Sequence, residues 1–130
     1  MSQTTCRWCE IIQGIRKEDP YLKEILENDM SCVLIDIPFQ TNSMGYVTTD
    51  NAQGGKKTVE HLIQQGRKSI GMINGHESAY VSEKRLKGYK EKLNEFNIPI
   101  IEKWTVNGGF EEIKSENITH TLLTIKTNNR

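Results

Sequence analysis

The sequence predicts an α/β fold in which a mostly parallel sheet lies between helices as a three-layer sandwich. Two observations lead to this fold class. Short runs rich in β-branched residues, such as Cys32–Ile37, are apolar at consecutive positions, as is typical of parallel strands buried on both faces. Between these runs lie segments such as Ser82–Phe96, whose apolar residues recur at helical spacing. Strands that alternate with helices in this way are joined by right-handed crossovers.

The first part of the chain is expected to hold a strand, a helix and a second strand. The short apolar run Glu10–Ile15 predicts a buried strand. Asp19 is placed to act as the N-cap of a helix, and Pro20 as its first residue, where the missing N–H costs nothing. This helix is expected to end near Asn28. The run Cys32–Ile37 then predicts a central strand of the parallel sheet.

The middle of the chain repeats the same alternation. Gly45–Thr49 predicts a short strand, and Asp50 then caps a helix whose apolar side is made by Val59, Leu62 and Ile63. Gly66 is a suitable C-terminal stop for this helix. A further strand is predicted directly after it, over Ser69–Asn74.

The last regular pattern is a helix that Ser82 caps and Asn97 ends, followed by a strand over Ile100–Val106. Beyond Phe110 the pattern is lost, and only the threonine-rich alternation of Ile118–Lys126 predicts a loose strand. We therefore expect a divergent N-terminal segment over residues 1–9, the α/β part over 10–110 and a divergent C-terminal tail over 111–130.

Composition and charge exclude several classes of protein. The chain has 130 residues, with 17 basic and 17 acidic side chains, so its formal charge is zero. This balance argues against nucleic-acid binding by the chain's own surface, because such binding depends on an excess of basic residues. No apolar run is long enough for a membrane helix, and the polar start lacks the apolar stretch of a secretory signal. Three cysteines are typical of reduced thiols, so we expect a cytoplasmic protein without membrane contact.

The sequence offers little for catalysis or for metal binding. Cys6 and Cys9 have the spacing of redox or zinc sites, but a zinc site needs four ligands and the three histidines are isolated. No nucleophile–base pair and no phosphate-binding glycine loop is present. We therefore expect no catalytic residue, no metal site, no cofactor and no enzymatic activity. The alternative of a small α/β enzyme would have to rely on Asp50 and Arg85.

Two side chains stand out as candidates for ligand binding. Open α/β sheets bind ligands beyond the carboxyl ends of their strands, and Asp50 and Arg85 are both predicted to lie there. The guanidinium of Arg85 can donate paired hydrogen bonds to vicinal hydroxyls or to a carboxylate. Each residue also has a simpler interpretation: Asp50 as a helix cap, and Arg85 as one more charge on a basic helix.

A long, ordered series of short stretches resembles the effector-binding domain of LacI/GalR-type transcriptional regulators. The resemblance extends over about residues 11–110. It is densest in Tyr46–Asn51, Gly54, Glu60–Ile63, Gly66–Arg67, Ser69–Ile70, Ile73–Gly75, Ser82 and Arg85–Tyr89.

The resemblance implies a type I periplasmic-binding-protein fold, in which two α/β subdomains enclose a small effector, commonly a sugar. This chain would form most of the N-terminal subdomain. The family's ligand-contacting arginine matches Arg85, and its aspartate before the helix matches Asp50. Ser82, His76 and Tyr80 are expected to border the same cleft. In the family, effector binding shifts a DNA-binding dimer between two states, so a homodimer is a further expectation.

The chain also departs from the family's pattern. The DNA-binding headpiece and the first strand and helix of the N-terminal subdomain are absent before Met1, and after Phe110 the sequence no longer follows the family. We therefore expect the sensing part of a truncated regulator, which binds a carbohydrate weakly and contacts DNA only through a headpiece that is absent here. The alternatives are a small binding or dimerisation module without regulatory activity, and a non-functional gene remnant.

Overall fold

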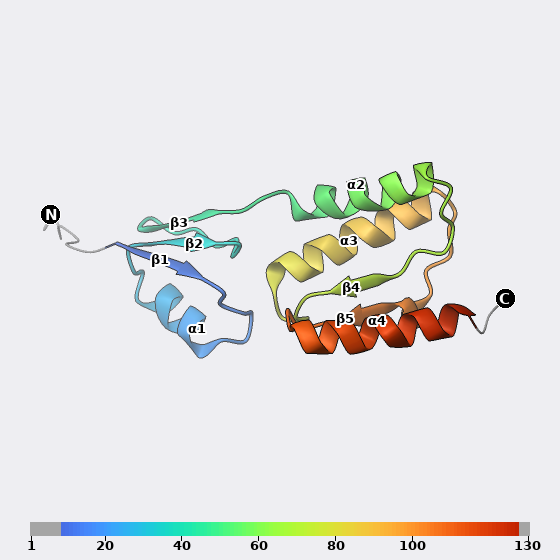
Figure 1. Ribbon diagram of the computed structural model, residues 1–130. Coiled ribbons are helices and arrows are strands. Elements are labelled where there is room, and N and C mark those ends of the chain that lie inside the picture. Colours follow the sequence, from blue (N-terminus) through green and yellow to red (C-terminus); the bar gives the residue numbers. More distant parts are fainter. Residues whose placement is uncertain (1–8, 128–130) are drawn as a thin grey trace, which may run out of the picture. The chain divides into compact units, whose positions relative to one another are not determined.

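A computed structural model describes residues 9–127 and contains four α-helices and five strands within this range (Figure 1). All strand pairs are parallel. The contacts divide the chain into two compact units. Unit 1 extends to Thr49 and includes Ser78–Tyr80, while unit 2 consists of Asp50–Glu77 and the chain from Val81 onward. The predicted α/β fold with parallel strands is confirmed. The division falls inside the range 10–110, which we expected to form one α/β part.

Unit 1 is a three-stranded sheet with one helix packed on it. The strands β1 (Glu10–Gln13), β2 (Cys32–Ile35) and β3 (Met44–Val47) lie in that order. Helix α1 (Pro20–Glu27) covers one face. Its residues Leu22 and Ile25 complete an apolar core, because the strands direct alternate side chains toward the helix. The other members of this core are Ile12, Cys32, Leu34, Ile37 and Met44.

Helix α1 begins where the sequence predicts. The side chain of Asp19 accepts a hydrogen bond from the backbone N–H of Tyr21, and Pro20 occupies the first helical position. Both assignments are therefore confirmed, and Asn28 is the C-cap. Strand β1 ends at Gln13, two residues earlier than predicted, because Gly14 adopts a left-handed conformation with φ of +81°.

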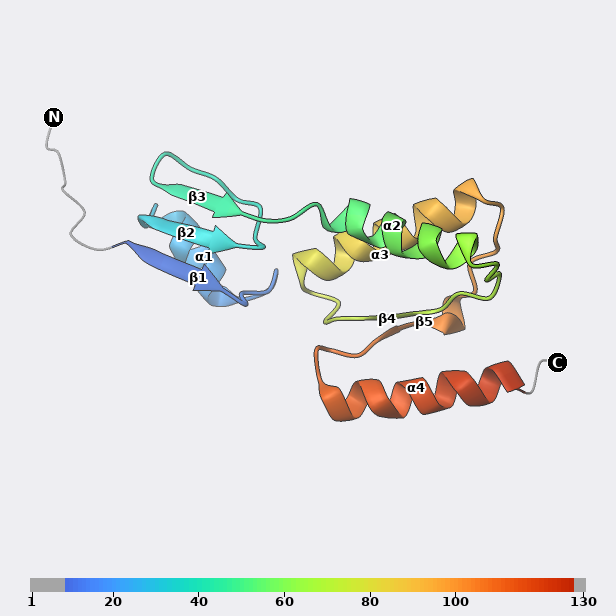
Figure 2. The same cartoon turned by 45° about the horizontal axis from the view of Figure 1, so that its top comes forward.

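Unit 2 is built in three layers (Figures 1 and 2). Its sheet has two strands, β4 (Met72–Asn74) and β5 (Thr105–Asn107). Helices α2 (Asn51–Gln64) and α3 (Tyr80–Glu95) cover one face of this sheet, and α4 (Glu112–Thr127) covers the other. The buried core lies between the sheet and the helix pair and consists of Val59, Ile70, Tyr89 and Leu93.

Glycines allow α2 and α3 to approach each other closely. A Cβ placed on Gly88 of α3 would lie 2.0 Å from the backbone oxygen of Ala52 in α2. A Cβ placed on Gly55 would lie 2.5 Å from the backbone oxygen of Arg85. Neither position has room for a side chain, so the two glycines bring the beginnings of both helices together.

The C-terminal part of unit 2 corrects one prediction. Residues Ile118–Lys126 belong to helix α4 and do not form a loose strand. Thr119, Thr121 and Thr124 each donate a side-chain hydrogen bond to the backbone oxygen four residues earlier, at 2.8 to 3.0 Å. This bonding satisfies the hydroxyls within the helix, and it explains why a threonine-rich stretch is compatible with helical structure.

Several further boundaries differ from the predictions. Strands β2 and β3 each end two residues before the predicted end, and β4 begins three residues after the predicted start. The strand predicted over Ile100–Val106 is shorter, because a 3₁₀ turn, η1 (Glu102–Trp104), precedes β5. Helix α3 begins at Tyr80, two residues before Ser82. Gly66, with φ of +78°, follows the end of α2 as predicted. None of the helices in residues 9–127 combines the length and the apolar character that crossing a membrane requires.

Candidate functional site

The candidate site lies at one end of unit 2, where β4 and β5 terminate and α2 and α3 begin (Figure 1). This is the carboxyl edge of a parallel sheet, the edge at which α/β folds bind ligands. The helix N-termini add backbone N–H groups that have no partner inside their own helix. The arrangement follows from the connections, because each strand of unit 2 lies antiparallel to the helices packed on it.

Asp50 forms the first part of this end. Its side-chain Oδ1 accepts a hydrogen bond of 2.9 Å from the backbone N–H of Gln53, so Asp50 is the N-cap of α2. The capping interpretation is confirmed. The side chain is also exposed, and its role in ligand binding stays a prediction.

Arg85 is joined to the beginning of α2 by a side-chain hydrogen bond. Its Nε donates to Oδ1 of Asn51 over 2.9 Å. Asn51 is buried with 8% of its surface exposed, whereas Arg85 itself is exposed. This is the one hydrogen bond or ion pair that the side chain of Arg85 makes within residues 9–127. One edge of the guanidinium is thus held by the protein, and its two terminal amino groups remain available to a ligand.

Sequence reasoning missed Asn51 as a member of the site. The signal was present, because Asn51 directly follows Asp50 in a stretch that resembles the LacI/GalR pattern. Its contact with Arg85, however, spans 34 positions of the chain, and only the packing of α2 on α3 brings the two residues together.

Ser82 lies one turn before Arg85 and is almost completely buried, with 1% of its surface exposed. Its backbone oxygen accepts a hydrogen bond of 2.9 Å from the side-chain amide of Asn74, at the end of β4. Its hydroxyl, in contrast, has no hydrogen-bond partner among the described residues. A buried polar group in this state is costly, and it points to a ligand or water that would complete the site.

Phe110 is a second residue that sequence reasoning missed. A Cβ placed on Gly75 would lie 2.0 Å from Cζ of Phe110 and 2.7 Å from Oγ of Ser82. The aromatic ring therefore rests on the glycine, next to the unpartnered hydroxyl. Phe110 is 59% exposed and has a positive φ of 63°, which is unusual for a bulky residue. An exposed ring held in such a conformation is a candidate contact surface for a ligand.

The structure divides the five predicted site residues between the two units. Asp50, Ser82 and Arg85 belong to this end of unit 2, and His76 lies half-buried in the loop that follows β4. Tyr80 belongs to unit 1 instead. There its ring makes an edge-to-face contact with Phe39 at 5.8 Å between centroids, and Lys17 Nζ lies 5.4 Å from its centre. The role predicted for each of the five residues stays a prediction.

The cysteines form no recognisable metal centre. No group of three or more histidine, cysteine or acidic side chains within residues 9–127 is arranged to hold a metal ion. Cys9 is an exposed free thiol, and Cys6 lies outside the described residues. Cys32 is buried in the core of unit 1, where burial raises the pKa of its thiol.

Comparison with known proteins connects this geometry to one group of regulators. No family profile matches the chain. It is 40% identical over 63 residues to the HTH-type transcriptional repressor PurR of Actinobacillus pleuropneumoniae serotype 5b, a match covering 48% of this chain and 19% of the repressor.

Solved structures share the fold over most of the chain. A LacI-type transcriptional regulator of Bacillus cereus subsp. cytotoxis superposes with a TM-score of 0.80 at 24% identity, covering 89% of this chain and 42% of the regulator. A complex of the transcriptional regulator CelR with cellobiose superposes with a TM-score of 0.77 at 24% identity. The match covers 88% of this chain and 36% of CelR. The chain thus spans about a fifth of the repressor that it matches in sequence and about two fifths of these regulators.

Proposed function

This chain is a relative of the LacI/PurR-type transcriptional regulators, and from that premise we propose that unit 2 carries part of a binding site for a small polar effector, with a carbohydrate as the ligand class. The relatives in sequence are transcriptional repressors, and the structural neighbours are LacI-family regulators. The role assigned to this chain is recognition of the effector, without catalysis.

The observation that carries the proposal is the hydrogen bond between Arg85 and Asn51. A free arginine side chain loses much conformational entropy when it binds a ligand, because it has many rotamers. The bond of 2.9 Å from Nε to Oδ1 of Asn51 holds the plane of the guanidinium before any ligand arrives. The two terminal amino groups then form a planar pair of donors that suits two adjacent hydroxyls of a sugar.

Ser82 and Phe110 support a carbohydrate as the ligand. The hydroxyl of Ser82 is buried beside the ring of Phe110, so a sugar would reach it only by displacing this ring; it could then both donate and accept a hydrogen bond. The exposed ring of Phe110 offers an apolar face next to it. Sites for small molecules combine an apolar surface with a few well-placed polar groups, and this end of unit 2 provides both. The cellobiose bound by CelR, a structural neighbour, is a ligand of the same class.

In a regulator, such a site would act by a shift of populations. An effector that binds one conformation more tightly than another displaces the equilibrium toward it, and the size of the shift depends on the difference in affinity. The zero net charge of this chain gives its surface no general attraction to DNA. We therefore assign effector recognition to the chain and leave DNA contact to another part of a regulator.

The test is an NMR titration of the full chain with a panel of monosaccharides and disaccharides that includes cellobiose. The Nε–H of Arg85 and the side-chain amide of Asn51 serve as probes, because their hydrogen bond places both at the site. We expect saturable shifts of both signals in the millimolar range for at least one sugar. In Arg85→Ala, where only the Asn51 amide remains as a probe, we expect this amide to show no saturable shift.

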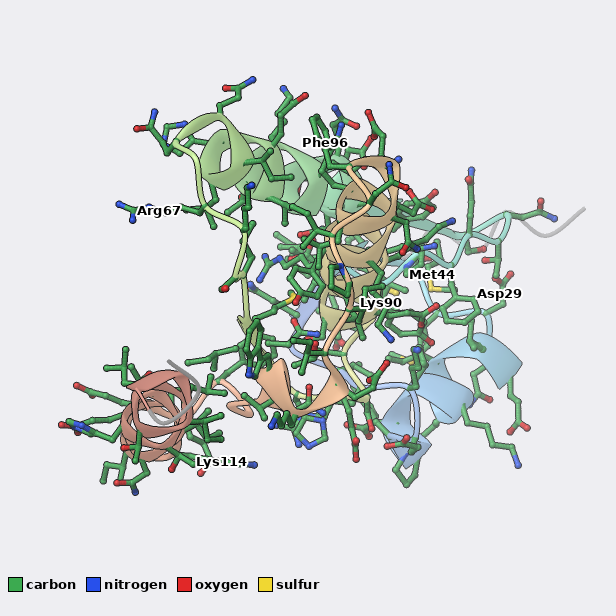
Figure 3. The ribbon with its side chains drawn as sticks, turned by 90° about the vertical axis from the view of Figure 1, so that its right-hand side faces the viewer. Asp29, Met44, Arg67, Lys90, Phe96 and Lys114 are labelled. Atoms are coloured by element: carbon green, nitrogen blue, oxygen red, sulfur yellow. The ribbon has the colours of Figure 1, made fainter. Side chains whose placement is uncertain are left out.

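Arg67→Ala is the matched control, since Arg67 is an exposed arginine that projects away from the molecule (Figure 3). We expect this variant to titrate like the unaltered chain. Two outcomes would refute the proposal: no saturable shift with any sugar, or shifts of the same size in Arg85→Ala.

A further inference from the structure

Phe110 lies in the short turn that connects β5 to α4 (Figure 2). The N–H of Glu111 donates a hydrogen bond of 3.1 Å to the backbone oxygen of Gly108, which closes this turn. Within the turn, Gly109 and Phe110 both adopt the left-handed conformation, with φ of +69° and +63°. Glycine takes this conformation freely, whereas the Cβ of a residue such as phenylalanine makes it unfavourable. The turn therefore holds Phe110 under strain.

The strained turn places the ring of Phe110 on Gly75, which directly follows β4. A Cβ on Gly75 would lie 2.0 Å from Cζ and 2.1 Å from Cε1 of the ring, so only a glycine leaves room for it. The same Cβ position lies 2.7 Å from Oγ of Ser82. Ring and hydroxyl thus share the space that a side chain at position 75 would fill.

This arrangement satisfies neither of the two side chains. The ring offers no hydrogen bond, so the hydroxyl of Ser82, a residue that is only 1% exposed, stays without a partner among the described residues. A buried hydroxyl in this state has lost its hydration without compensation. The ring belongs to a residue that remains 59% exposed, so it gains only part of the free energy that complete burial would provide. Backbone strain, an unsatisfied hydroxyl and modest burial together make the ring easy to displace.

We propose that the ring of Phe110 is an internal occupant of the effector site, which covers Ser82 while the site is empty and gives way when a sugar binds. This inference rests on the proposed function and deepens it. On release, Phe110 leaves the left-handed conformation, and the hydroxyl of Ser82 exchanges an apolar neighbour for a hydroxyl of the sugar. Binding then removes both the strain and the unsatisfied group, so that sugar binding and ring release favour each other.

Ring release gives the chain two states with different affinities for the effector. In the covered state a sugar reaches Arg85 but not Ser82, and in the released state it reaches both. A ligand shifts an equilibrium only by its difference in affinity for the two states, and its apparent affinity falls with the fraction of the competent state. Because Phe110 lies two residues before α4, release of its ring also changes the turn from which this helix begins.

The test follows the contact between Phe110 and Gly75 by NMR during the sugar titration of the full chain. In the sugar-free chain we expect nuclear Overhauser effects between the ring protons of Phe110 and the Hα protons of Gly75, because the ring lies on this glycine. We expect them to disappear over the same sugar concentrations that shift the signals of Arg85 and Asn51. A contact that is absent from the sugar-free chain, or that persists at saturation, would overturn the inference.

Ser82→Ala separates ring release from binding itself. Alanine offers no hydrogen bond to a sugar and leaves no unsatisfied hydroxyl under the ring, so we expect the contact of Phe110 with Gly75 to persist while the signals of Arg85 and Asn51 still respond. Loss of the contact in this variant would contradict the role given to the hydroxyl. In the unaltered chain, responses of Arg85 and Asn51 with a persistent contact would remove this inference alone, whereas a panel without any response would remove the proposed function as well.

Gly109→Ala alters the balance between the two states and leaves the ring and the hydroxyl unchanged. The new Cβ meets only the ends of two flexible side chains, Glu111 and Lys114, so its main effect is to disfavour the φ of +69°. The covered state requires this φ, and we expect the apparent dissociation constant for the sugar to fall about fivefold.

Gly66→Ala is the matched control for this variant. Gly66 is also left-handed, with φ of +78°, has nothing within 4 Å of its Cβ position, and follows the end of α2 that is remote from the site. We expect this variant to bind the sugar like the unaltered chain. Equal dissociation constants for Gly109→Ala and Gly66→Ala would contradict the release of Phe110 from its left-handed conformation.

Discussion

The side chain of Arg85 in α3 donates a hydrogen bond of 2.9 Å from Nε to Oδ1 of Asn51, the buried first residue of α2. The two residues are 34 positions apart, and the bond joins the beginnings of two helices at the carboxyl edge of the sheet in unit 2. It connects the stability of this unit to the orientation of the residue that we assign to ligand binding.

Removal of the Asn51 side chain is expected to destabilise the protein and to uncouple Arg85. Asn51→Ala should lower the free energy of unfolding by about 1 kcal/mol, the usual contribution of one hydrogen bond. In a double-mutant cycle with Arg85→Ala, urea unfolding should show a coupling energy of about 0.5–1.5 kcal/mol. Asn51→Asp keeps the acceptor and should retain the coupling. Additive effects of Asn51→Ala and Arg85→Ala would show that the bond contributes nothing in solution.

Asp50 allows capping and ligand binding to be separated. Asp50→Ala removes the hydrogen bond to Gln53 N–H and should cost about 1 kcal/mol of stability. Asp50→Asn should cost only a few tenths, because asparagine is an equally good N-cap. If the carboxylate also contacts the effector, both variants should weaken the sugar-induced NMR shifts. Thermal unfolding and the titration together decide this, and an unchanged titration for Asp50→Asn would leave Asp50 as a cap alone.

The close approach of α2 and α3 predicts opposite effects for two glycine substitutions. Gly88→Ala should destabilise the protein by about 1–3 kcal/mol, since its Cβ would lie 2.0 Å from the backbone oxygen of Ala52. Gly54→Ala, in the same pair of helices, meets nothing within 4 Å. It should stabilise the protein by about 0.5–1 kcal/mol through helix propensity. Chemical unfolding measures both, and equal effects for the two variants would contradict the helix packing described above.

Asp29 predicts part of the response to acid. Its carboxylate accepts hydrogen bonds from the hydroxyls of Thr41 and Ser43, and these bonds hold the pKa of Asp29 below its usual value (Figure 3 shows its position in unit 1). A lowered pKa in the folded state stabilises the protein above the pKa of the unfolded chain, about 3.9, and this contribution is lost as the pH falls through the folded value.

The comparison that checks this is between the unaltered chain and Asp29→Asn. Asparagine tolerates the positive φ of 45° that Asp29 adopts, so the variant isolates the charge. The unaltered chain should be the more stable of the two near neutral pH, and the difference should shrink below about pH 4. A difference in unfolding midpoint that stays constant from neutral pH to about pH 3 would be inconsistent with this role.

Local signals in the sequence predicted much of the fold. Asp19 and Asp50 cap their helices as expected, because an N-cap depends on a side chain and on a backbone N–H two or three residues away. The parallel arrangement was also predictable, since consecutive apolar residues and intervening helices are its local consequence. Because these signals come only from neighbouring residues, helix α4 was not predicted. Its threonines favour strands by propensity, and their hydroxyls are satisfied only once the helix has formed.

The sequence by itself determined the fold class, the helix caps and the candidates Asp50 and Arg85, because each depends on neighbours within a few residues. Tertiary structure decided the rest. It placed Asn51 against Arg85, and it left the buried hydroxyl of Ser82 without a partner among the described residues beside Phe110. These features depend on contacts between segments that are distant along the chain, and no periodicity or spacing in the sequence specifies which distant groups will meet.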